Sequence, residues 1–288
     1  QAFYIKDRSA LETPPDVRQR IYEELWEKGG FQFRASFNDL LSNKEANDTA
    51  AQFIIHKIRQ KIKDPAVADI LTDIDHPFAA KRPPIDTNYF ETYNRDNVTL
   101  VDIRHAPIER ITERGIKTSD AEYDLDIIVF ATGFDAMTRP LLRLNIEGEN
   151  GLPLAEAWKA GPRNYLGLQV PGFPNMFTIT GPGSPSVLTN MPVAIEQHVE
   201  WITQCIADMQ AKGFKKIEAS EEATANWLEH VNIAANKTLL PLAKHSWYLG
   251  ANVPGKPRVF MPYTGGMAFY RKECEAIVKD SYAGFLRS

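Results

Sequence analysis

The stretch Tyr123-Asp124-Leu125-Asp126-Ile127-Ile128-Val129-Phe130-Ala131-Thr132-Gly133-Phe134-Asp135 decides the fold. Its centre, Ile127 to Phe130, is an unbroken apolar run between acidic residues, which is typical of a strand buried on both faces of an α/β sheet. A turn of small residues follows, where Gly133 can take a positive φ and the backbone can approach another group closely. Ligands of open α/β sheets collect at the carboxyl ends of strands. The stretch therefore predicts either a ligand-binding turn or a core strand that simply ends in a tight turn.

Length and composition indicate a globular protein of one or two domains. The chain has 288 residues, of which 43% are hydrophobic and 24% charged, enough to bury a substantial core. A formal net charge of -4 gives no general attraction to nucleic acid or anionic membranes. No signal peptide or apolar run of membrane-spanning length is visible, so we expect no membrane partner and a cytoplasmic location.

Cysteine and histidine usage gives no support to a metalloenzyme. Cys205 and Cys274 stand in apolar helical patterns, which indicates buried structural thiols in a reducing compartment. The six histidines show no metal-ligand spacing, and no Gly-x-Ser-x-Gly elbow is present. A zinc enzyme and a serine hydrolase are both unsupported.

The residues that precede the opening stretch divide into a helical and an extended part. Residues 1–72 predict three helices: one begins at Pro15 and ends at Gly29, one follows a cap at Ser42, and one begins at Pro65. We expect them to form an insertion beside the sheet. Further on, Val98 to Val101 predicts a strand, and residues 107–112 and 116–118 predict a hairpin. Short strands joined in this way suit the β-meander that closes a dinucleotide-binding domain.

The residues after Asp135 predict a strand, a glycine turn and a helix. The strand is Met176 to Thr180, and the helix is capped by Asn190 and opened by Pro192. Later helices follow Ser220 and run from about Phe269 to Phe285. In the helix capped by Asn190, the apolar residues repeat along one face, which we expect to be the buried face: Ile195, Val199, Ile202, Ile206 and Met209.

Two glycine-rich stretches resemble phosphate-binding loops and fail as such. Residues 250–256 fit a P-loop, but Pro257 supplies neither the hydroxyl nor the N–H that the next position needs. Gly181-Pro182-Gly183 lacks a third glycine, and its prolines remove amide donors. The helix that follows would still present free amides and partial positive charge in front of Leu188 and Met191, which suits an electron-rich ring or an ordinary buried helix start.

Two further candidates each have an ordinary interpretation. The pair Lys81-Arg82 lies in a proline-stiffened segment; it is either a solvated cation pair or a fixed guanidinium that stabilises an oxyanion or a phosphate. Trp247 is either a core side chain or the wall of a pocket with an indole N–H that donates to a ribose or a substrate.

Taken together, these segments resemble the carboxy-terminal half of a Baeyer–Villiger monooxygenase of the phenylacetone, steroid and cyclohexanone group. The resemblance covers nearly the whole chain in one register. It is carried by Lys81-Arg82, residues 88–98, Ala131-Thr132-Gly133-Phe134-Asp135, residues 181–191, residues 196–201 and residues 247–258.

The resemblance implies a fold, cofactors and a reaction. The fold is α/β, a Rossmann-like flavoprotein with two dinucleotide-binding domains. Residues 1–131 would belong to the NADP domain, with residues 1–72 as its helical insertion, and residues 132–288 to the FAD domain. NADPH would reduce FAD, and the reduced flavin with O₂ would give a C4a-peroxyflavin that attacks a ketone and yields an ester or lactone.

Individual roles are also implied by the resemblance. Arg82 matches the catalytic arginine beside the flavin, since a guanidinium offsets negative charge without donating a proton. Lys81 and Trp247 match NADP contacts, Met191 matches a flavin contact, and Thr132 and Gly133 lie in a cofactor-binding turn. The substrate pocket would be lined by Ser186, Val187 and Leu188.

One departure leaves alternatives open. The two Gly-x-Gly-x-x-Gly fingerprints and the Phe-x-Gly-x-x-x-His signature of the resembled family are absent, so we expect a fragment that lacks most of the FAD site. The rival interpretations are a flavin monooxygenase that oxygenates nitrogen or sulfur, and a module that has lost catalysis.

Overall fold

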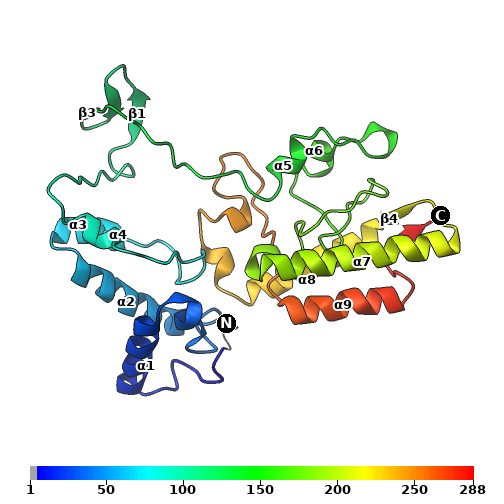
Figure 1. Cartoon of the computed structure of the whole chain (residues 1–288), viewed down its shortest axis with the longest axis horizontal. Coiled ribbons are helices and arrows are strands. Elements are labelled where there is room, and N and C mark those ends of the chain that lie inside the picture. The colour runs from blue at the N-terminus through cyan, green and yellow to red at the C-terminus, as the bar shows by residue number, and fades with distance from the viewer. Residues whose placement is uncertain (1–4) are drawn as a thin grey trace. The chain divides into compact units, whose positions relative to one another are not determined.

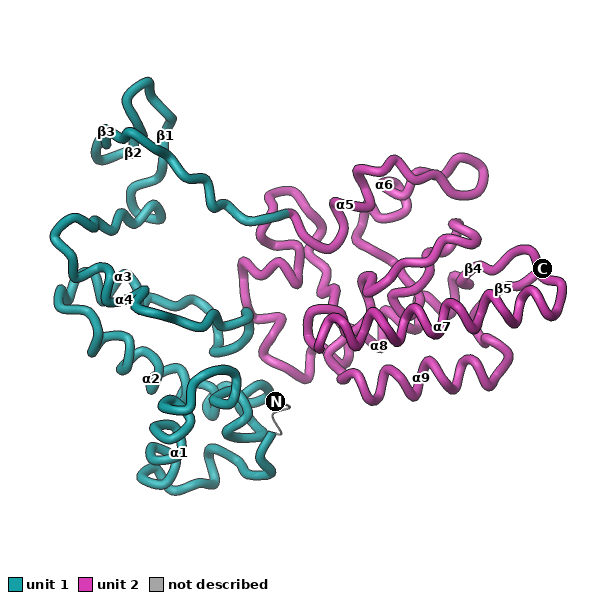
Figure 2. The backbone as a smooth tube through the Cα atoms, viewed as in Figure 1, with its two compact units in different colours: residues 1–134 teal, residues 135–288 magenta. Residues whose placement is uncertain are grey.

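The structure is a computed structural model that describes residues 5–288. The chain separates into two compact units, residues 1–134 and residues 135–288 (Figure 2). The boundary predicted after residue 131 falls close to this division. The assignment of the two parts to NADP- and FAD-binding domains stays a prediction, and residues 1–4 of the predicted insertion lie outside the described residues.

The first unit opens with helices that the sequence predicted (Figure 1). They are α1 at Pro15–Lys28, a 3-10 turn η1 at Gly30–Ala35, α2 at Lys44–Lys61 and α3 at Pro65–Thr72. Proline at the start of α1 and Gly29, with φ of 66°, at its end set its bounds as expected. The cap of α2 is a correction: Asn43, not Ser42, accepts the Ala46 N–H, at 3.2 Å.

An aromatic core holds α1 to α2. Tyr22 is buried, and its ring centroid lies 5.0 Å from that of Phe33, 5.4 Å from Phe37 and 5.3 Å from Phe53. Offset and edge-to-face contacts at these distances stabilise beyond the area they bury. The insertion therefore has a core of its own.

The predicted hairpin is confirmed and gains a third strand. β1 (Ile108–Ile111), β2 (Gly115–Thr118) and β3 (Glu122–Asp124) form an antiparallel sheet in that order, after a short helix α4 at Tyr89–Thr92. The strand expected at Val98 to Val101 is wrong. The Val98 N–H instead donates to the Arg95 carbonyl at 3.1 Å, which closes a turn.

The central strand expected at Ile127 to Phe130 does not form among the described residues. Figure 1 draws this segment, after β3, as an extended chain without a strand. Ile127 is 79% exposed, Val129 82% and Phe130 73%. The local sequence pattern is that of a buried strand, but a strand exists only where neighbours pair with it, and the described part of the chain supplies none.

The second unit is mostly helical. Its long helices are α7 (Met191–Lys212), α8 (Glu221–Asn236) and α9 (Met267–Lys279), and a two-stranded sheet pairs β4 (Ile217–Ala219) with β5 (Phe285–Arg287). Short turns complete it: α5 (Arg139–Leu142), η2 (Glu149–Gly151), α6 (Leu154–Ala157), η3 (Ser186–Leu188), η4 (Leu240–Leu242) and η5 (Trp247–Leu249). The caps predicted at Asn190 and Ser220 are confirmed.

The buried face of α7 differs from the one expected. Ile195, Val199 and Ile206 are exposed, and the core side chains are Ala194, His198, Trp201, Cys205 and Met209. Helix α7 is apolar on two sides, and α9 covers the side that carries Trp201, whose indole N–H donates to the Cys274 carbonyl at 3.2 Å. Periodicity alone cannot choose between two apolar sides.

Two other expectations in this unit are wrong. Met176 to Thr180 is irregular, because the Thr178 N–H donates to the Leu168 carbonyl at 2.8 Å within a network of turns. The last helix ends at Lys279, not near Phe285. Phe285 lies in β5 instead, paired with Ala219 of β4.

Candidate functional site

The turn that precedes α7 is fixed by hydrogen bonds from three directions. The Gly183 N–H donates to the Met261 carbonyl at 2.7 Å, and the Tyr263 N–H donates to the Ser184 carbonyl at 2.7 Å. The indole N–H of Trp227 donates to the Gly183 carbonyl at 2.9 Å. Gly183 has φ of 91°, a conformation open to glycine at little cost. The chain therefore enters η3 from a rigid position.

Three of the predicted site residues meet in one apolar cluster. Val187, Leu188 and Trp247 are half-buried and pack against the same core residues, among them Leu240, Leu249 and Phe260. The ring of Trp247 lies 4.7 Å from that of Tyr248, between centroids. We call Val187, Leu188 and Trp247 the apolar wall. Part of each side chain stays accessible, so the wall can contact a ligand as well as the core.

The N terminus of α7 follows directly after the wall. Met191 is the first residue of the helix and is half-buried, and the Asn190 side chain accepts the Val193 N–H at 3.5 Å. Pro192 has no N–H to donate. Since a helix N terminus carries partial positive charge, this end favours an electron-rich group. Ser186, which precedes Val187 of the apolar wall in sequence, is buried and has φ of 42°.

His198 ties this turn to the core, a role that the sequence did not indicate. Its Nδ1 accepts the Thr180 N–H at 2.9 Å, so the ring proton is on Nε2 and is donated to the Tyr270 hydroxyl at 2.8 Å. That hydroxyl in turn donates to the Leu166 carbonyl at 2.6 Å. Burial lowers the pKa of His198 to about 4, so the ring is neutral at ordinary pH.

The residue His198 holds is in an unusual conformation. Thr180 has φ of 53°, which a β-branched residue rarely adopts. The sequence signal for this role is Thr180-Gly181, adjacent to the predicted turn. Thr180 lies 18 residues before His198 and Tyr270 lies 72 residues after it. Only the fold brings them together.

Lys256, in the stretch that resembles a P-loop, contacts a carboxylate and a carbonyl of the protein itself. Its ammonium lies 2.5 Å from an Asp135 carboxylate oxygen and donates to the Ala136 carbonyl at 3.1 Å. Burial tends to raise the pKa of Asp135, but the contact with Lys256 outweighs it and the pKa is lowered. The loop after η5 is thereby fastened to the first residue of the second unit.

The remaining predicted site residues belong to the first unit. The Arg82 guanidinium carbon lies 5.5 Å from the centroid of the Phe31 ring, and Arg82 is exposed while Lys81 is half-buried. Thr132 and Gly133 are exposed in the segment after β3, and Gly133 has φ of 82°, as the sequence allowed. The structure brings Ser186, the apolar wall and Met191 together within the second unit. The cofactor and catalytic roles of the first-unit residues stay predictions.

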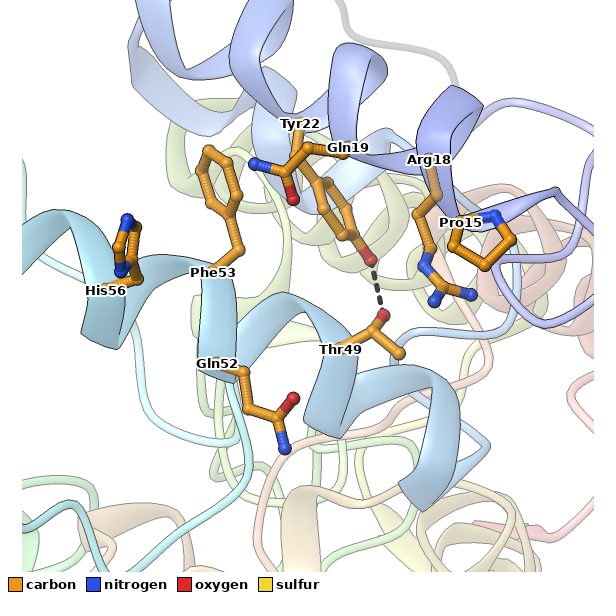
Figure 3. Close-up of a pocket in the computed structure, with 8 residues that line it drawn as sticks. All are labelled: Pro15, Arg18, Gln19, Tyr22, Thr49, Gln52, Phe53 and His56. Atoms are coloured by element: carbon orange, nitrogen blue, oxygen red, sulfur yellow. Dashed lines mark hydrogen bonds between the residues drawn. The ribbon is translucent and has the colours of Figure 1, made fainter.

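A hollow of about 390 Å³ lies between α1 and α2, and none of the predicted site residues is among those that line it (Figure 3). The Tyr22 hydroxyl and the Thr49 hydroxyl meet across it at 2.8 Å. It is lined by Pro15, Arg18, Gln19, Tyr22, Thr49, Gln52, Phe53 and His56. Burial raises the pKa of Tyr22, so its hydroxyl stays protonated.

Residues 5–288 contain no cluster of three or more potential metal ligands. Within the same residues, none of the helices has both the length and the apolar character needed to cross a bilayer.

The chain is similar to curated monooxygenases over nearly its whole length, although no protein-family model matches it. A 2-oxo-Δ3-4,5,5-trimethylcyclopentenylacetyl-CoA monooxygenase of Pseudomonas putida is 44% identical, over 96% of this chain and 52% of that protein. A Baeyer–Villiger monooxygenase of Pseudooceanicola batsensis is 42% identical, over 95% and 50%. A phenazine N-monooxygenase of Lysobacter antibioticus is 38% identical, over 96% and 51%. The chain spans about half the length of these relatives.

Solved structures of monooxygenases also match nearly the whole chain and about half of their own length. An oxidized steroid monooxygenase bound to NADP matches 99% of this chain and 53% of its own, with a TM-score of 0.90 and 48% identity. A crystal structure of OTEMO in complex with FAD and NADP matches 99% and 53%, with a TM-score of 0.94 and 44% identity. The predicted fold class is thereby confirmed: the chain has the mixed helix and sheet fold of about half of such a flavoprotein.

Proposed function

This chain belongs with the Baeyer–Villiger monooxygenases, corresponding to about half of their length, and from this premise we propose that the protein it forms part of uses NADPH, FAD and O₂ to convert ketones into esters or lactones. The observation that carries the proposal is the apolar wall at the N terminus of α7, in a fold shared with proteins solved with FAD and NADP bound. The buried thiols Cys205 and Cys274 agree with the reducing, cytoplasmic location that we propose.

The residues present fit a planar, electron-rich cofactor. A half-buried tryptophan and two aliphatic side chains offer a flat apolar surface, and the adjoining helix end offers partial positive charge. Met191 would contact the flavin, Trp247 and Lys81 would contact NADP, and Ser186, Val187 and Leu188 would line the ketone pocket. When bound and reduced, the flavin supplies the electrons that activate O₂.

Each side chain then has a defined task. The apolar wall excludes water from the reacting carbonyl, which keeps electrostatic interactions strong. The rigid turn from Gly181 to Ser184 holds Ser186 and the wall in position, so that little reorganisation is needed when the ketone binds. The Arg82 guanidinium offsets negative charge on oxygen without supplying a proton.

The proposal is tested by Arg82→Ala in the complete protein. We expect NADPH to reduce the flavin at the normal rate while ester formation is abolished, because the guanidinium acts only once oxygen carries negative charge. Anaerobic stopped-flow measurement of flavin reduction and chromatographic analysis of the product check the two halves. The matched control is Arg114→Ala, an exposed arginine of the hairpin turn, which should leave both unchanged. Normal ester yield in Arg82→Ala would remove Arg82 from the mechanism.

One relative favours a second candidate reaction. The phenazine N-monooxygenase is 38% identical over 96% of this chain, so the same half of the fold also occurs in a protein named for oxygenation of nitrogen. Incubation of the complete protein with a cyclic ketone and, separately, with a phenazine decides between the two. Ester from the ketone supports the first proposal, and N-oxide without ester supports the second.

A further inference from the structure

The segment that carries Arg82 is attached to α2 by one buried amide. Asn47, near the start of α2, is fully buried, and its side chain pairs with the backbone of Phe78 in both directions. The Phe78 N–H donates to Asn47 Oδ1 at 2.8 Å, and Asn47 Nδ2 donates to the Phe78 carbonyl at 2.9 Å. The same Nδ2 donates to the Leu40 carbonyl at 2.7 Å. One side chain thus joins three stretches of the chain at a single point.

The chain that follows Phe78 is held in a turn. The Ala80 N–H donates to the Pro77 carbonyl at 3.1 Å, and Ala80 is 1% exposed. Ala79, between them, has φ of 59°, a left-handed conformation that is unfavourable for alanine and persists where the surroundings fix it. Among residues 5–288, the two bonds between Phe78 and the Asn47 amide are the only hydrogen bonds that join residues 76–82 to a helix.

Aromatic rings of η1 contact both ends of this segment. The ring of Phe78 meets that of Phe33 edge to face, with centroids 5.5 Å apart, and the Arg82 guanidinium carbon lies 5.5 Å from the centroid of the Phe31 ring. A cation–π contact of an exposed arginine is weak by itself. The position of the guanidinium therefore depends on where the backbone is fixed, which is at Phe78.

We propose that Asn47 is a positioning residue for Arg82: it fixes the backbone from which the guanidinium reaches the negative charge that it offsets. The proposal rests on the proposed function, because it assumes that Arg82 acts on a charged oxygen. A charge held in place needs no reorganisation during the reaction, and a displacement of about 1 Å can cost about 100-fold in rate. The alternative is that Asn47 only stabilises the helical insertion.

Two substitutions in the complete protein separate these roles. Asn47→Ala removes all three hydrogen bonds. Asn47→Asp keeps the volume of the side chain and still accepts the Phe78 N–H, but an ionised carboxylate cannot donate to the two carbonyls. The matched control is Ile58→Ala, which opens a cavity on the same helix, where Ile58 is buried and packs with Ile62 and Ala68.

Ester yield distinguishes positioning from stability. At saturating NADPH, anaerobic reduction of the flavin should keep its normal rate in all three variants. The ester formed from a cyclic ketone per NADPH consumed should fall about 10- to 100-fold in both Asn47 variants, with NADPH reducing O₂ to hydrogen peroxide instead. Ile58→Ala should lower the temperature of thermal unfolding and keep the normal ester yield. An equal loss of ester in Ile58→Ala and Asn47→Ala would overturn the proposal.

Comparison with Arg82→Ala separates a failure of this proposal from a failure of the proposed function. Normal ester yield in Asn47→Ala, beside the loss expected for Arg82→Ala, would overturn the positioning role and leave the proposed function standing. Normal yield in both variants would overturn both. Ester loss in Asn47→Ala with normal yield in Arg82→Ala would also overturn the positioning role, because Asn47 would then act through another group.

Hydrogen exchange of the unsubstituted protein, followed by NMR, covers the case of variants that fail to fold. The Phe78 amide, bonded to the buried Asn47 side chain, should exchange at least about 100-fold more slowly than the amide of exposed Arg82. Equal exchange rates at the two positions would show that Asn47 does not hold the segment, and the proposal would be wrong.

Discussion

At the scale of single residues, His198 shows what sequence could and could not reveal. The sequence offered no metal-ligand partner for it and gave no sign that both ring nitrogens are engaged in hydrogen bonds. Its contacts with Thr180 and Tyr270 come from different elements, and no local pattern encodes them. By contrast, Val187, Leu188 and Trp247 were singled out by the family resemblance; the structure packs all three against one core cluster, and their roles toward substrate and NADP stay predictions.

Acid should destabilise the fold through His198. Its pKa is about 4 in the folded chain and near 6.5 in the unfolded chain. Between pH 6.5 and pH 4 the unfolded state therefore binds a proton that the folded state does not bind. The free energy of unfolding should therefore fall as the pH is lowered from 6.5 to 4, by about 3 kcal/mol from this group. Urea unfolding at pH 7 and pH 4.5 measures the change.

The matched variant is His198→Gln, which is less stable at pH 7 but has no proton to gain. The difference in unfolding free energy between the two proteins should shrink as the pH falls. A constant difference at both pH values would show that folding does not lower the pKa of His198.

At the scale of elements, helix starts were predictable and helix faces were not. Asn190 and Ser220 cap helices where the sequence indicated, because capping depends on residues within one turn. The buried side of α7 depends on α9 and β5, which lie far along the chain. Val98 to Val101 and Met176 to Thr180 failed for the same reason: strands need partners, and these segments bond to nearby turns instead.

Two substitutions on α7 should separate its two sides. Trp201 is 4% exposed and packs against Tyr282 and Phe285, so Trp201→Ala should cost roughly 3 to 5 kcal/mol of stability. Ile206 is 43% exposed, so Ile206→Ala in the 288-residue chain should cost about 0.5 kcal/mol or less. Chemical denaturation of both variants measures the costs. Similar losses at the two positions would mean that the Ile206 side is covered in the isolated chain as well.

At the scale of the whole molecule, the chain resembles a working monooxygenase over half of that protein's length. The chain divides into two compact units after residue 134, and the assignment of residues 1–131 and 132–288 to two cofactor-binding domains, which came from the family resemblance, stays a prediction. The sequence misjudged the strand before the turn at residues 131–133, because the apolar pattern is that of a buried strand, whereas no described residue pairs with this segment. A buried pattern in an exposed segment is thus informative in its own right.

The 288-residue chain alone should bind no FAD tightly. It offers one wall and one helix end toward the ring, and the glycine-rich fingerprints that hold a pyrophosphate are absent from the sequence. Purified chain incubated with FAD and passed through a desalting column should emerge colourless. A yellow sample with stoichiometric flavin absorbance would contradict this, and heat-denatured chain serves as the control for trapped flavin.

The ion pair between Asp135 and Lys256 should determine which fragment survives limited proteolysis. Asp135, the first residue of the second unit, is bound to Lys256, 121 residues downstream. If the peptide chain is cut just before Asp135, the new terminus therefore stays attached to the fold. The open segment at residues 126–133 is an easy place for a protease to cut. Brief digestion should accordingly release residues 135–288 as one protease-resistant fragment, whose new N-terminal residue is held by an ion pair.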